Sequence, residues 1–157
     1  MPEFGRIVTR VLNDYIRRIN ETPKQIVRDV FTRVINRTPI DYERKDPETV
    51  GRARANWIAT EGTFNKDTIE VNDEYGGQAP VLFSRGPTVR NMERFVDELN
   101  VDDNPRIYLT NNISYITRLE YLRISRQAPY GMRGITIAEF PMLVDIRARA
   151  EFSKRLT

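Results

Sequence analysis

Residues 4–35 read FGRIVTRVLNDYIRRINETPKQIVRDVFTRVI, and large apolar side chains recur along this stretch at steps of three and four. That spacing predicts helix, because residues three and four apart share one face of a 3.6-residue repeat. Thr22 and Pro23 interrupt the stretch and suit a helix start, as N-cap and first helical residue. The pattern therefore predicts either two helices that meet near residue 22 or one helix kinked there.

The apolar stripe keeps its phase across Thr22 and Pro23, so both halves are expected to face the same surface. Two interpretations of the first half stay open. It either packs in the core of its own chain or docks on an adjacent subunit, since a long helix projecting from a small domain would otherwise leave apolar area in water.

The remainder of the chain mixes strand and helix signals. Residues 52–60 alternate, with Trp57 on the apolar side, and predict a strand. Residues 68–71 are a weaker extended candidate, and residues 106–110 give the clearest strand signal. Helical spacing returns at residues 89–99 after the Pro87-Thr88 start signal.

The last helix is expected at residues 135–152. Its inward-facing residues are predicted to be Ile137, Phe140, Leu143, Val144 and Ile146. The predicted fold is thus α+β, a small and mostly antiparallel sheet packed against helices, with a long N-terminal helical segment. We expect one domain over residues 1–157, with N-terminal helices to residue 37 and exposed loops near 41–50 and 61–80.

Composition restricts the chemistry. The 157 residues include no Cys and no His, which excludes disulfides, thiolate sites and any nucleophile activated by His. Catalysis would depend on acidic clusters, Glu70 with Asp73 and Glu74 or Asp102 with Asp103, and a Mg²⁺-dependent nuclease is the enzyme alternative. Acids in such loops are usually only solvated, so we expect no enzyme activity, cofactor or metal.

The net charge of +3 is scattered along the chain, which favours a mixed-charge surface. A small basic DNA-binding module that uses the N-terminal helices is the binding alternative. Residues 1–4 lack the basic and apolar regions of a signal peptide, and no stretch reaches the length of a membrane span, so no membrane contact is expected.

The block from residue 111 to residue 140 combines a strand end, a Tyr-bearing segment, a Pro/Gly loop and a helix start. An Asn pair turns the chain through its own side chains, while tyrosines suit cores and interfaces alike. Each feature also has a local explanation that needs no subunit contact. The Asn pair could form an ordinary turn, Glu120 could form a solvated ion pair, and the Pro/Gly loop could be an ordinary connector to the last helix. The candidate interface residues are Asn111, Asn112, Tyr115, Glu120, Tyr121, Gln127, Pro129, Gly131 and Met132.

Together with Thr38-Pro39-Ile40-Asp41 and residues 51–57, this block resembles the neck and tail-completion proteins of long-tailed bacteriophages, the group around protein Z of lambda-like phages. The chain departs from the pattern at Val50, where the family has Thr, and at Leu122, where it has Gly. The resemblance implies a structural virion protein, made in the host cytoplasm, that forms a homo-oligomeric ring at the head–tail junction. A hexamer is expected and a dodecamer is the alternative. Head-completion or connector proteins and the tail tube or tail terminator would be its neighbours, and DNA would pass through the ring without sequence recognition.

Overall fold

The computed structural model describes residues 2–40, 51–69, 86–122 and 124–154. Its elements are, in order, helix α1 (Pro2–Arg37), helix α2 (Arg52–Ala55), strand β1 (Ile58–Glu61), helix α4 (Gly86–Glu98), strand β2 (Ile107–Thr110), helix α5 (Ile116–Tyr121) and helix α6 (Arg133–Phe152). The two strands pair antiparallel, with Ile58 opposite Thr110 and Glu61 opposite Ile107. The predicted α+β fold with its long N-terminal helix is confirmed.

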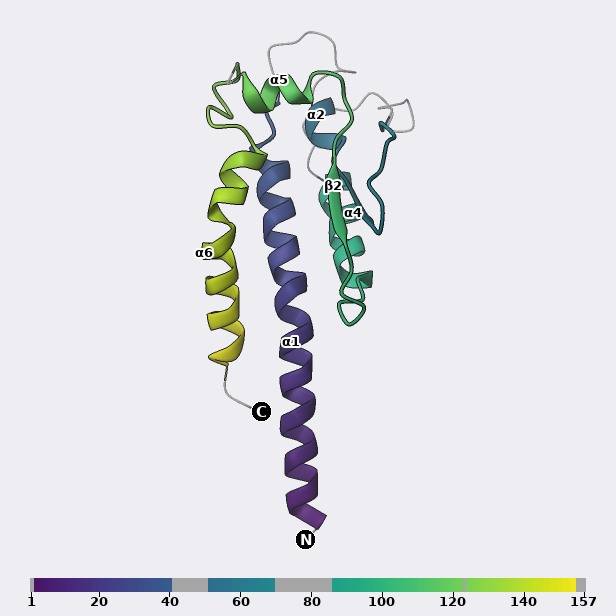
Figure 1. The fold of residues 1–157 in the computed structure, drawn as a ribbon, viewed down its shortest axis with the longest axis vertical. Helices are drawn as coiled ribbons and strands as arrows, with labels where there is room; N and C mark the ends of the chain where they lie inside the picture. The colour runs from purple at the N-terminus through teal and green to yellow at the C-terminus, as the bar shows by residue number, and fades with distance from the viewer. Residues whose placement is uncertain (1, 41–50, 70–85, 123, 155–157) are drawn as a thin grey trace.

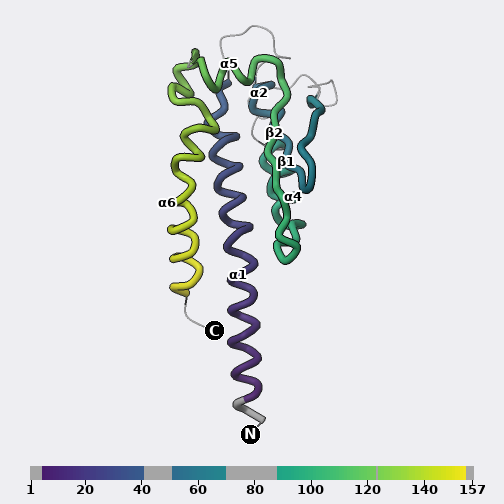
Figure 2. The backbone as a smooth tube through the Cα atoms, viewed as in Figure 1, coloured from purple at the N-terminus to yellow at the C-terminus, as the bar shows by residue number. Residues whose placement is uncertain are grey.

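Helix α1 is the central element (Figures 1 and 2). Helix α6 runs antiparallel along one side of it, and α4 with the two-stranded sheet lies on the other side. The N-terminal end of α1, purple in Figure 1, projects beyond both neighbours. The C-terminal half of α1 therefore lies within a compact body, and its N-terminal half projects from that body.

Helix α1 continues through Pro23, so of the two predicted alternatives the pair of helices is wrong and the single helix holds. The Thr22 hydroxyl does not cap a helix start but donates to the Arg18 carbonyl oxygen at 2.8 Å. Proline inside a helix removes one backbone donor and costs about 3 kcal/mol. Helix α6 spans the break and offsets that cost, because it binds Arg18 on one side of Pro23 and Asp29 on the other.

The strand predicted over residues 52–60 is wrong in its first half. Residues 52–55 form helix α2, which follows Gly51 at φ 76°, and only Ile58–Glu61 is strand. Arg54 explains the helical turn, since its guanidinium donates to the carbonyl oxygens of Thr38, at 2.6 and 2.9 Å, and of Asn36, at 3.1 Å. These hydrogen bonds satisfy carbonyl oxygens at the end of α1 and just beyond it, which have no backbone partner within the helix.

Two apolar clusters form the core around the C-terminal half of α1. The larger joins Phe31 and Ile35 of α1 to Met92 and Val96 of α4, and the smaller joins Val34 to Ala128 and Met132. The predicted buried side of Trp57 is confirmed in part, because its ring packs against both clusters while its indole N–H donates to the Thr38 hydroxyl at 2.7 Å.

Polar pairs join α6 to α1. Glu139 accepts hydrogen bonds from Arg37, at 2.8 and 2.9 Å, and from Arg33 at 2.7 Å. Two further bonds, at 2.5 and 2.7 Å, link Arg147 to Asp29. The hydrogen bond from Arg37, opposed by desolvation and helped by both arginine charges, lowers the pKa of Glu139. Charged groups thus occupy much of the side of α6 that faces α1.

The prediction that five residues of the last helix face inward is accordingly wrong for three of them. Leu143 is buried and Val144 half-buried, but Ile137, Phe140 and Ile146 are exposed. The sequence pattern could not reveal this, since α6 carries apolar residues on all sides and so has no single apolar face.

The predicted loop at 41–50 lies outside the described residues, as do residues 70–80 of the second loop. Residue 61 ends β1, and residues 62–69 form a largely exposed connection after it. Among the described helices, none is long and apolar enough to cross a membrane.

Candidate subunit interface

Glu120 of α5 caps the first turn of α6. One carboxylate oxygen accepts the backbone N–H groups of Met132 and Arg133, at 2.8 and 3.0 Å, and the other accepts that of Gly134 at 2.8 Å. Partial burial raises the pKa of Glu120, but the three amide donors together with the Arg133 charge outweigh burial, so the pKa lies below its ordinary value. The carboxylate satisfies donors at a helix N-terminus and stabilises the positive end of the helix dipole.

Gly131 is required by this arrangement for two reasons. Its φ of +79° is rarely adopted by other residues, and a Cβ at this position would lie 2.8 Å from the Glu120 carbonyl oxygen and 2.9 Å from a carboxylate oxygen. The loop before α6 therefore lies directly against the end of α5.

Polar side chains fix the neighbouring segments. Gln127 exchanges two hydrogen bonds with the backbone of Ile40, at 2.6 and 2.9 Å. Asn111 donates to the Ala53 carbonyl oxygen at 2.7 Å, and Asn112 donates to the carbonyl oxygens of Asn65 and Asp67 at 3.0 and 2.8 Å. These side chains hold loops together within one chain, so they shape the surface rather than project from it.

The exposed members of the block lie around α5. Tyr121 is 60 % exposed and its hydroxyl contacts the guanidinium of Arg133, which also lies over the ring. Tyr115 and Pro129 are exposed, whereas Met132 is buried in the core. A role of this region in a subunit contact stays a prediction. The predicted residues that are exposed, and that a partner could therefore reach, are Asn112, Tyr115, Tyr121, Gln127 and Pro129.

Three exposed side chains near α5 were not predicted. Leu122, Ile124 and Tyr130 are 59–68 % exposed and lie beside Tyr121 in the sequence or in the following loop. In the sequence they are interspersed with Arg, Ser and Gln between Tyr121 and the Pro129 loop, so no apolar periodicity marks them.

The N-terminal half of α1 carries the largest set of exposed apolar residues in the described chain. We call it the α1 stripe, and its members are Ile7, Val8, Val11, Leu12, Tyr15, Ile16 and Ile19, each 37–54 % exposed. The interpretation that this half packs in the core of its own chain is therefore wrong. The second half of α1 does pack there, through Phe31, Val34 and Ile35.

Helix α6 also exposes apolar residues around the sides that do not face α1. We call this set the α6 outer face, and its members are Ile137, Phe140, Met142, Ile146 and Phe152, each 45–62 % exposed. The set wraps around the helix, because Ile137 and Ile146 are about two and a half turns apart and so lie on opposite sides of it. Phe152 meets Tyr15 with ring centroids 6.0 Å apart, so the α1 stripe and the α6 outer face touch within one chain. Exposed apolar area on this scale marks an interaction surface.

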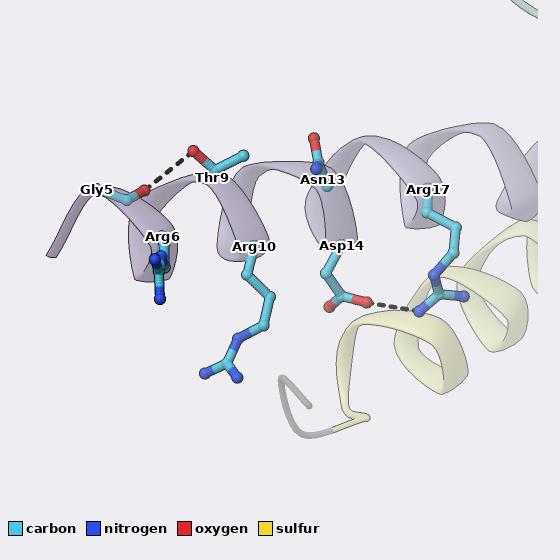
Figure 3. A pocket seen from close by; sticks show the side chains of 7 residues that line it. All are labelled: Gly5, Arg6, Thr9, Arg10, Asn13, Asp14 and Arg17. Carbon is cyan, nitrogen blue, oxygen red and sulfur yellow. Dashed lines mark hydrogen bonds and ion pairs between the residues drawn. The ribbon is translucent and has the colours of Figure 1, made fainter. Parts of the chain in front are cut away.

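The opposite side of the projecting half of α1 is polar (Figure 3). An open hollow there is lined by Gly5, Arg6, Thr9, Arg10, Asn13, Asp14 and Arg17. Asp14 binds Arg17 at 2.6 Å and Arg18 at 2.7 Å, and the hydrogen bond from Arg17 is the main reason why the pKa of Asp14 is lowered. The two sides of this half-helix thus differ sharply in character.

The acidic cluster that the structure describes does not resemble a metal site. Asp103 accepts a hydrogen bond from the Asn100 side chain at 2.6 Å, while the Asp102 amide donates to the same side chain at 3.2 Å, as in a local turn. The described residues contain no group of three acids that could hold a metal ion. Asp73, Glu74 and Glu70 lie outside the described residues.

No family model, curated protein or solved structure matches this chain.

Proposed function

We propose that this chain is a structural subunit of a bacteriophage neck, which joins tail to head as a ring with a channel for DNA. One observation carries the proposal: the α1 stripe and the α6 outer face expose a dozen large apolar side chains on two adjoining helices. Exposed apolar area of this extent marks a site where another molecule binds. The resemblance of residues 38–41, 51–57 and 111–140 to neck and tail-completion proteins says which assembly that would be.

The internal bonds of the 111–140 block support the same proposal. Glu120 and Gly131 bring α5 against the start of α6, and Gln127 ties the connecting loop to the segment after α1. The block therefore fixes the angle between the body and the helical pair. A ring subunit needs such a fixed angle, because repeated contacts close only if every copy has the same shape.

Electron cryomicroscopy of the neck of the assembled virion tests the proposal. The expected density is a ring of copies of this chain around the channel, with sixfold symmetry expected and twelvefold symmetry the alternative. Density for this fold elsewhere in the particle, or its absence from purified particles, contradicts the proposal.

The exposed tyrosines allow a genetic test of the same function. Tyr115→Ala combined with Tyr121→Ala is expected to reduce head–tail joining while the purified subunit keeps its helical circular-dichroism signal. Neither hydroxyl lies in the core, so folding is spared. Normal joining by the double variant would remove the α5 region from the interface.

A second candidate, a duplex-binding module, is favoured by the polar side of α1. Arg6 and Arg10 project from the same side as Arg17 along the half-helix that stands apart from the body. Basic side chains one helical turn apart suit contacts to phosphates. This function predicts duplex binding that weakens steeply with salt, and that Arg6→Gln with Arg10→Gln reduces the salt dependence. Negligible binding at low salt eliminates it.

A further inference from the structure

Among the described residues, the α1 stripe has no covering element over most of its length. It extends for about 18 Å along the helix, and the N-terminal end of α1 projects beyond the last residues of α6 (Figure 1). At 37–54 % exposure and about 200 Å² for a large side chain, the stripe presents on the order of 600 Å².

The α6 outer face is of matching size. Its members span residues 137–152, about 22 Å of helix, and at 45–62 % exposure they present on the order of 500 Å² by the same reckoning. Taken together the two surfaces present about 1,100 Å², which is less than the about 1,600 Å² of a standard protein interface but above the roughly 1,000 Å² that a specific interface needs. Either surface alone would be small for a stable contact.

We infer that the α1 stripe of one copy packs against the α6 outer face of the next copy. This inference rests on the proposed ring and specifies which surfaces meet in it. Each copy has one stripe and one outer face, so a single kind of contact covers both. In the proposed ring this contact is heterologous, and its repetition closes the ring when the rotation between copies allows it.

The alternative pairing of stripe with stripe explains less. A twofold dimer of that kind would cover α1 but leave Ile137, Met142 and Ile146 of α6 in water. It would also stop at two copies, because an isologous contact satisfies itself.

Charge does not oppose the inferred contact. The arginines of the projecting half, Arg6, Arg10 and Arg17, lie on its polar side. On α6, Asp145 pairs with Arg149 at 2.8 Å, while Arg147 and Glu139 are bonded to α1. Packing stripe against outer face therefore brings together few charges that lack a partner in the described chain.

The absence of cysteine from the chain permits a direct test by crosslinking. Val8→Cys labels the α1 stripe and Ala138→Cys labels the exposed side of α6, and both changes are small and lie on the surface. The two single-cysteine chains are co-expressed during particle assembly and treated with a short bis-maleimide. Because each chain carries one thiol, every link joins two copies.

The inference predicts linked dimers that contain one Val8→Cys chain and one Ala138→Cys chain. Asn13→Cys, on the polar side of the same half-helix, is the matched control and is expected to link to Ala138→Cys several-fold less. Links that form mainly between two Val8→Cys chains, or equally with Asn13→Cys, overturn the inference.

The same particles separate this inference from the proposed function. If several copies are present per particle but no link joins α1 to α6, the pairing of surfaces is wrong and the ring stands. If particles contain no copies of the chain, both fail.

Discussion

Removal of the Glu120 carboxylate is predicted to loosen the junction between α5 and α6. Its two oxygens accept three backbone amides, from Met132, Arg133 and Gly134, at 2.8–3.0 Å. A hydrogen bond to a charged group contributes roughly 1.5–3 kcal/mol, but Arg133 and Gly134 are exposed and water can replace the carboxylate there. We therefore expect Glu120→Ala to lower the free energy of unfolding by about 2–3 kcal/mol.

The prediction has a pH signature that identifies the group. The pKa of Glu120 is lower in the folded chain than the ordinary value of 4.5. As the pH falls, the unfolded chain binds the proton first, so the carboxylate stabilises the fold fully above about pH 4.5 and progressively less as the pH falls through the folded pKa. The stabilisation that the Glu120 carboxylate contributes should therefore disappear under acidic conditions.

Urea unfolding of wild type, Glu120→Ala, Glu120→Gln and Glu93→Gln between pH 3.5 and pH 7 measures both effects. The amide of Glu120→Gln keeps one acceptor oxygen but places a donor against a backbone donor, so a loss of about 1–2 kcal/mol is expected at pH 7. The difference from wild type should shrink toward pH 3.5. Glu93 is exposed on α4 and serves as the control for loss of one charge. Equal profiles for Glu120→Gln and Glu93→Gln would refute the reasoning.

Three further predictions concern the backbone, the exposed surface and the core. Gly131→Ala should lower the free energy of unfolding by at least about 2 kcal/mol through its φ of +79° and the clash with the end of α5; thermal unfolding checks this, and an unchanged midpoint would contradict it. Leu12→Asp should abolish incorporation into particles at an unchanged unfolding temperature, while Asn13→Asp, which adds the same charge on the polar side, should assemble normally. Thr38→Val leaves the Trp57 indole N–H without its acceptor and should lower the free energy of unfolding by about 1–3 kcal/mol. The emission maximum of this single tryptophan should shift, and unaltered emission and stability would count against the hydrogen bond.

Elements with one apolar face could be predicted from the sequence. Helix α4 and strand β2 lie where the spacing predicted them. Helix α4 presents Met92 and Val96 to the core, and Ile107 and Leu109 of β2 pack against it although all four strand residues are half-buried. Residues 52–55 could not be assigned, since alternating Ala and Arg fits one turn of helix as well as a strand. The choice depends on Arg54, whose acceptors at the end of α1 are distant in sequence and known only from the fold.

The candidate block shows a similar division. Its Asn, Pro and Gly residues indicate turns and a stiff loop, but the hydrogen-bond partners of its polar side chains could not be deduced from the sequence. The sequence suggests an ion pair for Glu120, but its carboxylate instead accepts hydrogen bonds from backbone amides twelve to fourteen residues later. Gln127 bonds a segment eighty-seven residues away. Contacts of this range depend on the tertiary arrangement and leave no periodic trace in the sequence.

The distribution of polar and apolar groups on α6 is the strongest argument that the chain works in an assembly. A helix on the surface of a monomer places apolar residues inward and charges outward. Helix α6 reverses much of this order, because Glu139 and Arg147 bind α1 while Ile137, Met142 and Ile146 face water. Charged pairs at a partly wet contact contribute little to stability, so they fix the alignment of α6 on α1 more than they drive its burial. The apolar side is thereby left in a fixed orientation for a partner, which is the arrangement that a subunit of a closed ring needs.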